Sequence, residues 1–185
     1  MTSPGPIPIT PRGFTLMEML VTLSIAATLA AVAVPSFSTW LIRSRVDSQA
    51  GSLLSGMRLA RSEAASRGAW VVLCPTTDHG ASCSTSGANW SRGWMVFVDV
   101  DRSGSRQAGS EALLQLADGI SGNLSATVAG FTDAVITFSP YGGLLQGGAP
   151  AAGGSIRLCA GSGTSGRQVR VDASGRPSSM KVTCP

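Results

Sequence analysis

The chain has 185 residues, of which 13% are charged and 5% aromatic, and its formal net charge is +4. This length leaves room for one domain of common size beside an apolar terminal segment, which argues against a large enzyme. The 23 glycines favour a turn-rich β domain, and the modest positive charge does not by itself demand a nucleic-acid partner.

The first segment, residues 1–13, is rich in proline and contains a single arginine. Proline disfavours a helix interior, because its ring removes a backbone donor and clashes with the preceding turn. We therefore expect an extended leader that a peptidase can reach and remove.

The next segment, residues 14–42, is apolar apart from one ionisable side chain, that of Glu18. At about 1.5 Å per helical residue, it is long enough to cross a hydrocarbon layer of about 30 Å. A secretory signal would place a small-residue cleavage site after such a run. No such site follows Val34, and the distinctive junction, Arg12-Gly13-Phe14, lies before the run. The sequence predicts a transmembrane or filament-core helix that is retained.

Glu18 is the unusual feature of this helix. An unpaired carboxylate in an apolar layer costs roughly 2.5–3.5 kcal/mol on insertion scales, so we expect a cationic partner for it. Pro35 should cost one backbone hydrogen bond and bend the helix.

This stretch resembles the class III signal of type IV prepilins and type II secretion pseudopilins. The resemblance implies cleavage by prepilin peptidase after Gly13 and methylation of the new terminus at Phe14. It also implies that Glu18 pairs with the terminal amine of a neighbouring subunit during assembly. Pro35 falls where many pilins carry a helix-bending proline.

Residues 43–68 continue the helix but change to an amphipathic pattern. Apolar residues recur at intervals of three and four: Val46, Ala50, Leu53, Leu54, Met57, Ala60 and Ala64. Gly68 is a natural stop for a helix. One helix from about Phe14 to Arg67 is predicted, with its second half packed on a sheet.

From residue 69 onward the pattern is that of strands and turns. We predict strands at Trp70–Cys74, Trp90–Val100, Glu111–Leu116, Ala134–Ser139, Ser155–Cys159, Gln168–Asp172 and Met180–Cys184. The glycine-rich, nearly uncharged stretch Gly142–Gly154 is predicted to be a flexible or turn-forming surface loop.

All four cysteines follow the apolar helix. Their even number, and the presence of only one histidine, favour two disulfides in an oxidising compartment over a zinc site. Three pairings are open. We favour Cys74–Cys83 with Cys159–Cys184, because each of these pairs closes a short, loop-rich segment.

The polar loops offer weak candidates for chemistry. Asp99, Asp101, Ser103 and Gly104 are typical of the start of a calcium loop. The closing glutamate should stand at position 110, which is serine, and Glu111 is one residue late. A hairpin turn is therefore favoured over calcium. We find no nucleophile elbow and no phosphate-binding loop, so neither an enzyme nor a cofactor or resident metal is predicted.

Positive charge accumulates near the C-terminus at Arg157, Arg167, Arg170, Arg176 and Lys181. Such a cluster can bind phosphates, and its affinity would fall with salt. The alternative is a solvated strand face with ion pairs worth at most about 1 kcal/mol each. Double-stranded DNA is therefore kept as a candidate partner.

Several stretches of the later chain together resemble the GspH/FimT group of minor pilins and pseudopilins. They are Leu59–Ala64, Val72–Pro75, Trp90–Asp99, Leu158–Cys159 and Ser174–Arg176, while residues 105–150 match poorly. Some FimT members bind DNA through a C-terminal Gly-Arg-x-Arg motif. This chain has Gly175-Arg176-Pro177-Ser178 at that place, so the second arginine is missing.

The resemblance implies an α+β fold of the type IV pilin kind, with a long N-terminal helix packed on an antiparallel β domain, residues 69–185. It implies a low-abundance priming or tip subunit, assembled with other pilins or pseudopilins in a type IV pilus or a type II secretion pseudopilus. The chain would be a single-pass protein of the bacterial inner membrane with its C-terminal domain in the periplasm. The alternative function is DNA uptake in natural transformation.

Overall fold

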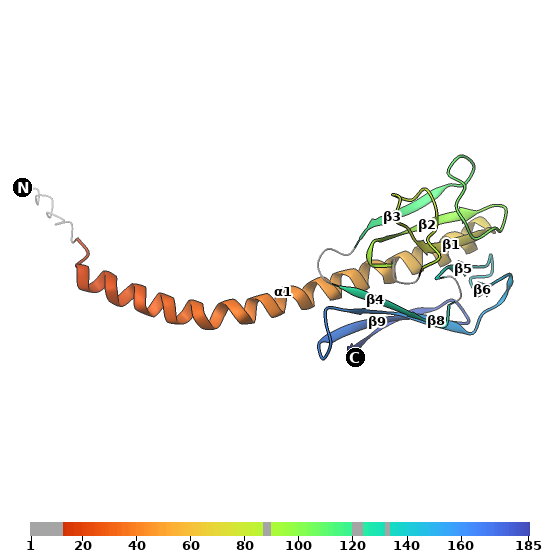
Figure 1. The fold of residues 1–185 in the computed structure, drawn as a ribbon. Coiled ribbons are helices and arrows are strands. Elements are labelled where there is room, and N and C mark those ends of the chain that lie inside the picture. The colour runs from red at the N-terminus through yellow and green to blue at the C-terminus, as the bar shows by residue number, and fades with distance from the viewer. Residues whose placement is uncertain (1–12, 87–89, 120–123, 132–133) are drawn as a thin grey trace, which may run out of the picture. The chain divides into compact units, whose positions relative to one another are not determined.

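The computed structural model describes residues 13–86, 90–119, 124–131 and 134–185, and of residues 32–36 it describes the backbone alone. Within these residues one long α-helix precedes ten strands in two antiparallel sheets (Figure 1). The predicted α+β fold, with an N-terminal helix packed on antiparallel sheets, is confirmed. The chain divides into two compact units, residues 1–41 and 42–185.

Helix α1 spans Leu16–Arg67, and local chemistry sets both of its ends. The Glu18 amide donates to Thr15 Oγ1 at 3.2 Å, and Thr15 with Glu18 has the spacing of a capping box. Helical structure therefore begins two residues after Phe14. At the other end Gly68 adopts φ +60°, and the Ala69 amide donates to the Ala64 carbonyl at 3.2 Å. This is the glycine stop that the sequence predicts.

Helix α1 continues through Pro35 without a break. The Pro35 side chain lies outside the described side chains, so the expected bend stays a prediction.

The second half of α1 buries one stripe of side chains in the core of the second unit. Every member of the stripe is at most 2% exposed: Val46, Ala50, Leu53, Met57, Ala60 and Ala64. Each was predicted from its helical spacing. Leu54 is only partly buried at the edge of the same core.

The first sheet has the strand order β3-β2-β1-β5-β6-β7. Its strands are β1 (Trp70–Pro75), β2 (Gly93–Asp99), β3 (Leu113–Asp118), β5 (Ile136–Phe138), β6 (Leu144–Gln146) and β7 (Ala149–Pro150). Both faces of the central strands are buried: Val71 and Val96 join the core with α1, while Val72 and Phe97 form a smaller cluster on the opposite face.

The second sheet has the order β10-β9-β8-β4. Its strands are β4 (Ser125–Ala129), β8 (Gly153–Cys159), β9 (Ser165–Asp172) and β10 (Pro177–Thr183). Ile156 and Leu158 of β8, with Val169 and Val171 of β9, face the same core as α1. The side chains between them in sequence therefore lie on the outer face of this sheet.

One prediction for the middle of the chain was wrong, and one strand was missed. The stretch Gly142–Gly154 is not a simple loop, because it contains the hairpin β6–β7 and the start of β8. Gly147 and Gly148 have φ of +55° and +83°, which allows a tight reversal between short strands. Strand β4 was missed altogether, since its sequence, Ser-Ala-Thr-Val-Ala, has too little apolar surface to predict a strand.

Candidate functional site

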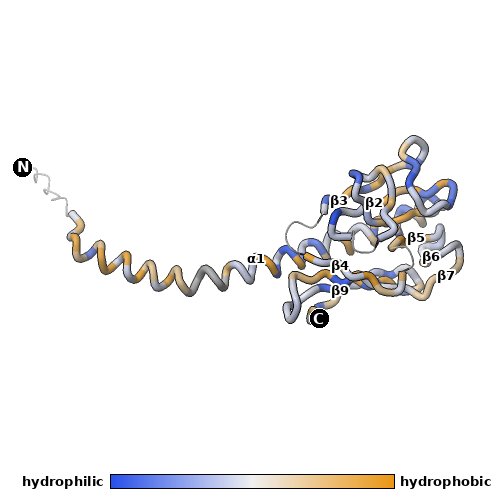
Figure 2. Tube along the Cα trace, in the orientation of Figure 1, coloured by the Kyte–Doolittle hydropathy of each residue, from blue (hydrophilic) through white to orange (hydrophobic). Residues whose placement is uncertain are grey.

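The N-terminal junction is exposed in the structure. Phe14 is 78% exposed, Glu18 is exposed in the first turn of α1, and Glu18 makes no ion pair within the described residues. Large apolar side chains of the following turns are also exposed: Leu16, Met17, Met19, Leu20, Val21, Leu23, Ile25 and Leu29. Figure 2 shows this half of α1 as a largely hydrophobic stretch. It therefore presents apolar surface that the described part of its own chain does not cover.

Over the described part of the chain, no helix combines the length and the apolar character needed to cross a membrane.

The candidate DNA-binding side chains do not share one surface; they are Arg167, Arg170, Arg176 and Lys181. Arg167 of β9 lies opposite Lys181 of β10, on the face of the sheet that carries Val169. Arg170 lies on the outer face, opposite Ser178. Arg176 stands in the turn between the two strands, where its amide donates to Asp172 Oδ1 at 3.0 Å. The structure thus divides the cluster among three locations.

Arg167 has a partner on the helix. Its Nε donates to Asp47 Oδ1 at 2.6 Å, which joins the second sheet to α1. The hydrogen bond from Arg167 lowers the pKa of Asp47, and the charge of Lys181 acts in the same direction. This hydrogen bond also raises the pKa of Arg167. Arg167, one of the predicted phosphate-binding residues, therefore already pairs with a carboxylate of its own chain.

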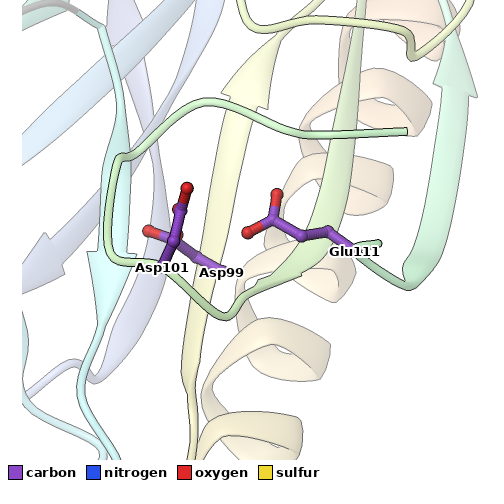
Figure 3. A group of neighbouring side chains, drawn as sticks. All are labelled: Asp99, Asp101 and Glu111. Carbon is purple, nitrogen blue, oxygen red and sulfur yellow. The ribbon is translucent and has the colours of Figure 1, made fainter. Parts of the chain in front are cut away.

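The acidic loop after β2 brings Asp99, Asp101 and Glu111 together, with one carboxylate oxygen from each lying within 4.8 Å of the others (Figure 3). Glu111 was one residue late for a calcium loop, yet it closes this group. Its two oxygens accept the amides of Val100 at 2.9 Å and Gln107 at 2.8 Å. Its carboxylate thus joins the two sides of the loop.

The two aspartates also accept backbone amides. Asp99 binds the amides of Ser103 at 3.1 Å and Gly104 at 3.0 Å, and Asp101 shares the Ser103 amide at 3.0 Å. Burial raises the pKa of Asp99, whereas the hydrogen bond from the Ser103 side chain lowers the pKa of Asp101. The carboxylates thus stabilise the loop by accepting its backbone amides. A bound cation would have to share the same carboxylate oxygens.

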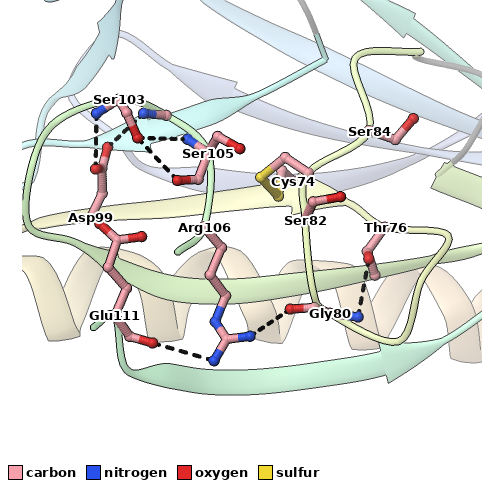
Figure 4. The surroundings of a disulfide bond; sticks show 12 residues. Cys74, Thr76, Gly80, Ser82, Ser84, Asp99, Ser103, Ser105, Arg106 and Glu111 are labelled. Atoms are coloured by element: carbon pink, nitrogen blue, oxygen red, sulfur yellow. Dashed lines mark hydrogen bonds between the residues drawn. A yellow bond between two sulfur atoms is a disulfide. The ribbon is translucent and has the colours of Figure 1, made fainter. Parts of the chain in front are cut away.

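The neighbouring loop is closed by the Cys74–Cys83 disulfide (Figure 4). Arg106 joins it to the acidic loop, since its guanidinium donates to the carbonyls of Gly80 at 2.6 Å and Glu111 at 3.3 Å. A second disulfide joins Cys159 at the end of β8 to Cys184. These are the two pairs that loop length favoured, and both tie loops to sheets.

Sequence reasoning missed one concave surface. A groove of about 400 Å³ lies between α1 and the turn that follows β5. Its lining includes Arg58, Arg61, Tyr141 and Pro177. Two signals could have indicated it: arginines three residues apart without a carboxylate at helical spacing, and a Ser-Pro-Tyr-Gly sequence typical of a tight turn.

Two family models match the chain. Residues 49–175 match the model for the type II transport protein GspH, and residues 11–34 match the prokaryotic N-terminal methylation motif. The second match contains the predicted junction at Gly13 and Phe14. None of the curated proteins compared with the sequence matches it.

Among solved structures, the fold is similar to that of the type IV minor pilin FimU of Pseudomonas aeruginosa, seen in two crystal forms. For the P21 form the identity is 22% and the TM-score 0.56, covering 75% of this chain and 90% of FimU. For the P65 form the identity is 22% and the TM-score 0.53, covering 72% of this chain and 91% of FimU. The type IV pilin-like fold that the sequence resemblance implied is thereby confirmed.

Proposed function

This chain belongs to the GspH family of type II transport proteins, and from that premise we propose that it is a minor filament subunit of a bacterial envelope. The observation that supports this most strongly is the exposed apolar surface of α1, which begins directly after the Gly13–Phe14 junction of the methylation motif. An apolar helix face that the described residues of its own chain leave uncovered needs a covering environment. Neighbouring helices in a filament supply one.

Each residue of the junction then has a defined role. Prepilin peptidase removes residues 1–13 by cutting after Gly13, and the amine of Phe14 is methylated. In the assembled filament the Glu18 carboxylate pairs with the terminal amine of an adjacent subunit. The pairing is supported by the exposure of Glu18 and by the lack of an ion-pair partner for it within the described part of its own chain.

The subunit acts as a structural, non-enzymatic part of a type IV pilus or a type II secretion pseudopilus, at low abundance and in a priming or tip position. Before assembly it is held in the inner membrane by residues 14–42, with its β domain in the periplasm. Two disulfides support this placement, because the periplasm is oxidising.

The cleavage step is tested by Gly13→Ala in cells that contain the assembly system. The wild-type chain should be recovered without residues 1–13, whereas the variant should keep its leader, and intact-mass measurement distinguishes the two. Gly51→Ala, an exposed glycine-to-alanine change within the helix, is the matched control and should be processed normally. Normal trimming of Gly13→Ala would refute the assigned cleavage site.

The assembly step is tested by Glu18→Ala, with Glu63→Ala as control. Glu63 is an acidic residue of the same helix, but it pairs with Arg67 on its own chain. Glu18→Ala should reduce the amount of this chain in sheared filaments while both disulfides still form. Equal recovery of the two variants would contradict the role of Glu18.

DNA binding by the exposed domain is the alternative function. It is supported only by the outer face of the second sheet, where Arg157 and Arg170 lie among Ser, Thr and Gln side chains. The ion pair between Arg167 and Asp47 argues against this alternative, because it occupies one of the candidate phosphate-binding side chains. Duplex DNA should be titrated against the full chain in detergent at several salt concentrations. Binding that weakens with salt and with Arg170→Ala would favour a role in DNA uptake. The absence of binding at low salt would exclude this alternative function.

A further inference from the structure

The turn after β5 presents the only tyrosine of the chain to solvent. Tyr141 is 97% exposed, more than any other large apolar or aromatic side chain in the described part of the protein. The Gly142 amide donates to the Ser139 carbonyl at 2.8 Å, which closes a four-residue turn with Pro140 in its second position. Proline fixes its own φ in such a turn, so the backbone under Tyr141 is held in one conformation.

The turn is anchored on two sides. On the helix side, Arg61 Nε donates to the Gly142 carbonyl at 3.2 Å. On the sheet side, the same carbonyl approaches Gly175 so closely that a Cβ there would lie 1.9 Å from it. An aromatic side chain on a fixed turn loses little conformational entropy when it is covered, which is a property of efficient binding surfaces.

The groove beside Tyr141 is positively charged. Arg58 and Arg61 lie three residues apart, so both face the groove from α1, and Ser62 and Ala65 give it a floor of small side chains. Among the residues that the structure describes, no carboxylate lines the groove. Arg58 makes no ion pair or hydrogen bond within the described ranges, whereas Arg67 and Arg167 are both paired with acids of their own chain. The groove therefore has cationic hydrogen-bond donors that the fold does not use.

We infer that this groove docks a carboxylate-bearing segment of a neighbouring protein subunit. A guanidinium can bind a carboxylate through two parallel hydrogen bonds, and Arg58 is free to do so. The Tyr141 ring would cover an apolar side chain beside that carboxylate, since tyrosine and arginine are the residues enriched at the energetic centres of interfaces. This inference rests on the proposed role as a filament subunit and adds the chemistry of the partner.

A protein carboxylate fits the groove better than a nucleic acid does. Stable binding of a duplex requires several phosphate contacts along a track. Here two arginines line a short groove, and Arg61 already holds the turn through Gly142. A single carboxylate placed between a guanidinium and an aromatic ring matches what the groove provides.

The test uses the full chain in cells that assemble the filament, with a photo-crosslinking amino acid in place of Tyr141. The expected product is a crosslink to another subunit, at a peptide that carries Asp or Glu. Arg58→Glu should lower the crosslink yield about tenfold, because it replaces an attraction with a repulsion. Arg92→Glu makes the same charge change at another exposed position and should leave the yield unchanged.

A reciprocal substitution sharpens this test. Changing the acidic residue of the crosslinked peptide to lysine should restore the yield in the Arg58→Glu chain. A nuclease-sensitive crosslink to DNA would overturn the inference, as would a yield that Arg58→Glu does not lower.

The same samples separate this inference from the proposed function. Intact mass reports whether the leader has been removed, and sheared filaments report whether the chain is incorporated. A processed, incorporated chain without a crosslink at position 141 refutes the docking inference alone. A chain that is neither processed nor incorporated refutes the proposed function, and the docking inference with it.

Discussion

The two halves of α1 have the same backbone conformation but opposite surroundings. From Leu16 to Leu29 the large apolar side chains are 48–81% exposed. From Val46 to Ala64 one apolar stripe is at most 2% exposed, because two sheets of the same chain cover it. The difference is what the proposed assembly expects, because the second half of the helix packs on its own domain while the first half would be covered by neighbouring subunits.

This comparison also explains why the two halves differ in sequence. A helix packed on one side by a sheet needs apolar residues only at intervals of three and four, and its other faces can carry charge. A helix surrounded by other helices or lipid needs apolar residues on every face. The change of pattern near Arg43 falls at the boundary between the two compact units, where the proposed function expects the environment to change.

The largest expected effect comes from removing a side chain in the buried stripe. Met57 is fully buried, so Met57→Ala should lower the free energy of unfolding of the domain by about 2–5 kcal/mol. Leu23→Ala is the counterpart in the first half, where Leu23 is 59% exposed, and it should leave that free energy unchanged. Urea denaturation, followed by tryptophan fluorescence, measures both. Equal losses of unfolding free energy in the two variants would contradict the difference between the two halves of the helix.

Glycine substitutions should change stability in opposite directions along the helix. A Cβ at Gly56 would lie 2.4 Å from the Trp94 ring, so Gly56→Ala should cost about 1–3 kcal/mol. Gly51 has nothing within 4 Å of a Cβ, so Gly51→Ala should stabilise the helix by about 0.5–1 kcal/mol. Thermal unfolding distinguishes them by the sign of the shift in Tm. A stabilising Gly56→Ala would show that the helix does not pack on Trp94 as described.

The ion pair between α1 and the second sheet should contribute less. Because the Asp47 side chain is 53% exposed, Arg167→Ala should cost at most about 1 kcal/mol. A double-mutant cycle with Asp47→Ala isolates the pair. The pKa of Asp47 is lowered below 3.8, so the contribution should be present above pH about 4 and be lost as the pH falls through the folded-state pKa. A coupling energy that stays constant down to pH 2 would contradict the pairing.

The smallest effect is expected at Asp78 in the loop closed by Cys74–Cys83. Hydrogen bonds from Ser82 lower the pKa of Asp78 from 3.8 to about 2. Its stabilising contribution is therefore complete above pH about 4 and declines as the pH falls toward 2. Asp78→Asn should flatten the dependence of the unfolding free energy on pH over this range. An unchanged pH dependence in Asp78→Asn would contradict the role of these hydrogen bonds.

Much of this architecture could be predicted because it depends on local patterns. The helix, its stop at Gly68 and the buried stripe follow from spacing alone, and the central strands follow from dense β-branched and aromatic residues. The edge elements could not be predicted, because β4, β6 and β7 depend on pairing with distant strands. For β4, the partner β8 begins 24 residues later and supplies the apolar neighbours that β4 itself lacks.

The candidate sites show the same limit. Nearness in the sequence grouped four basic residues, but strand alternation and a turn separate them in space: Arg167, Arg170, Arg176 and Lys181. Spacing placed Glu111 one residue too late for the acidic loop, yet the backbone brings it to Asp99 and Asp101. The groove at Tyr141 joins residues about 80 positions apart, a relation that no local pattern contains.

The Cys159–Cys184 bond has a consequence for the order in which the domain can form. Cys184 directly follows β10, which forms one edge of the second sheet. During vectorial synthesis, at about 5–20 residues per second, the N-terminal helix emerges many seconds before this cysteine does. Helix α1 is thus available before Cys184 is, and this disulfide can close the domain covalently only after β10 has been synthesised.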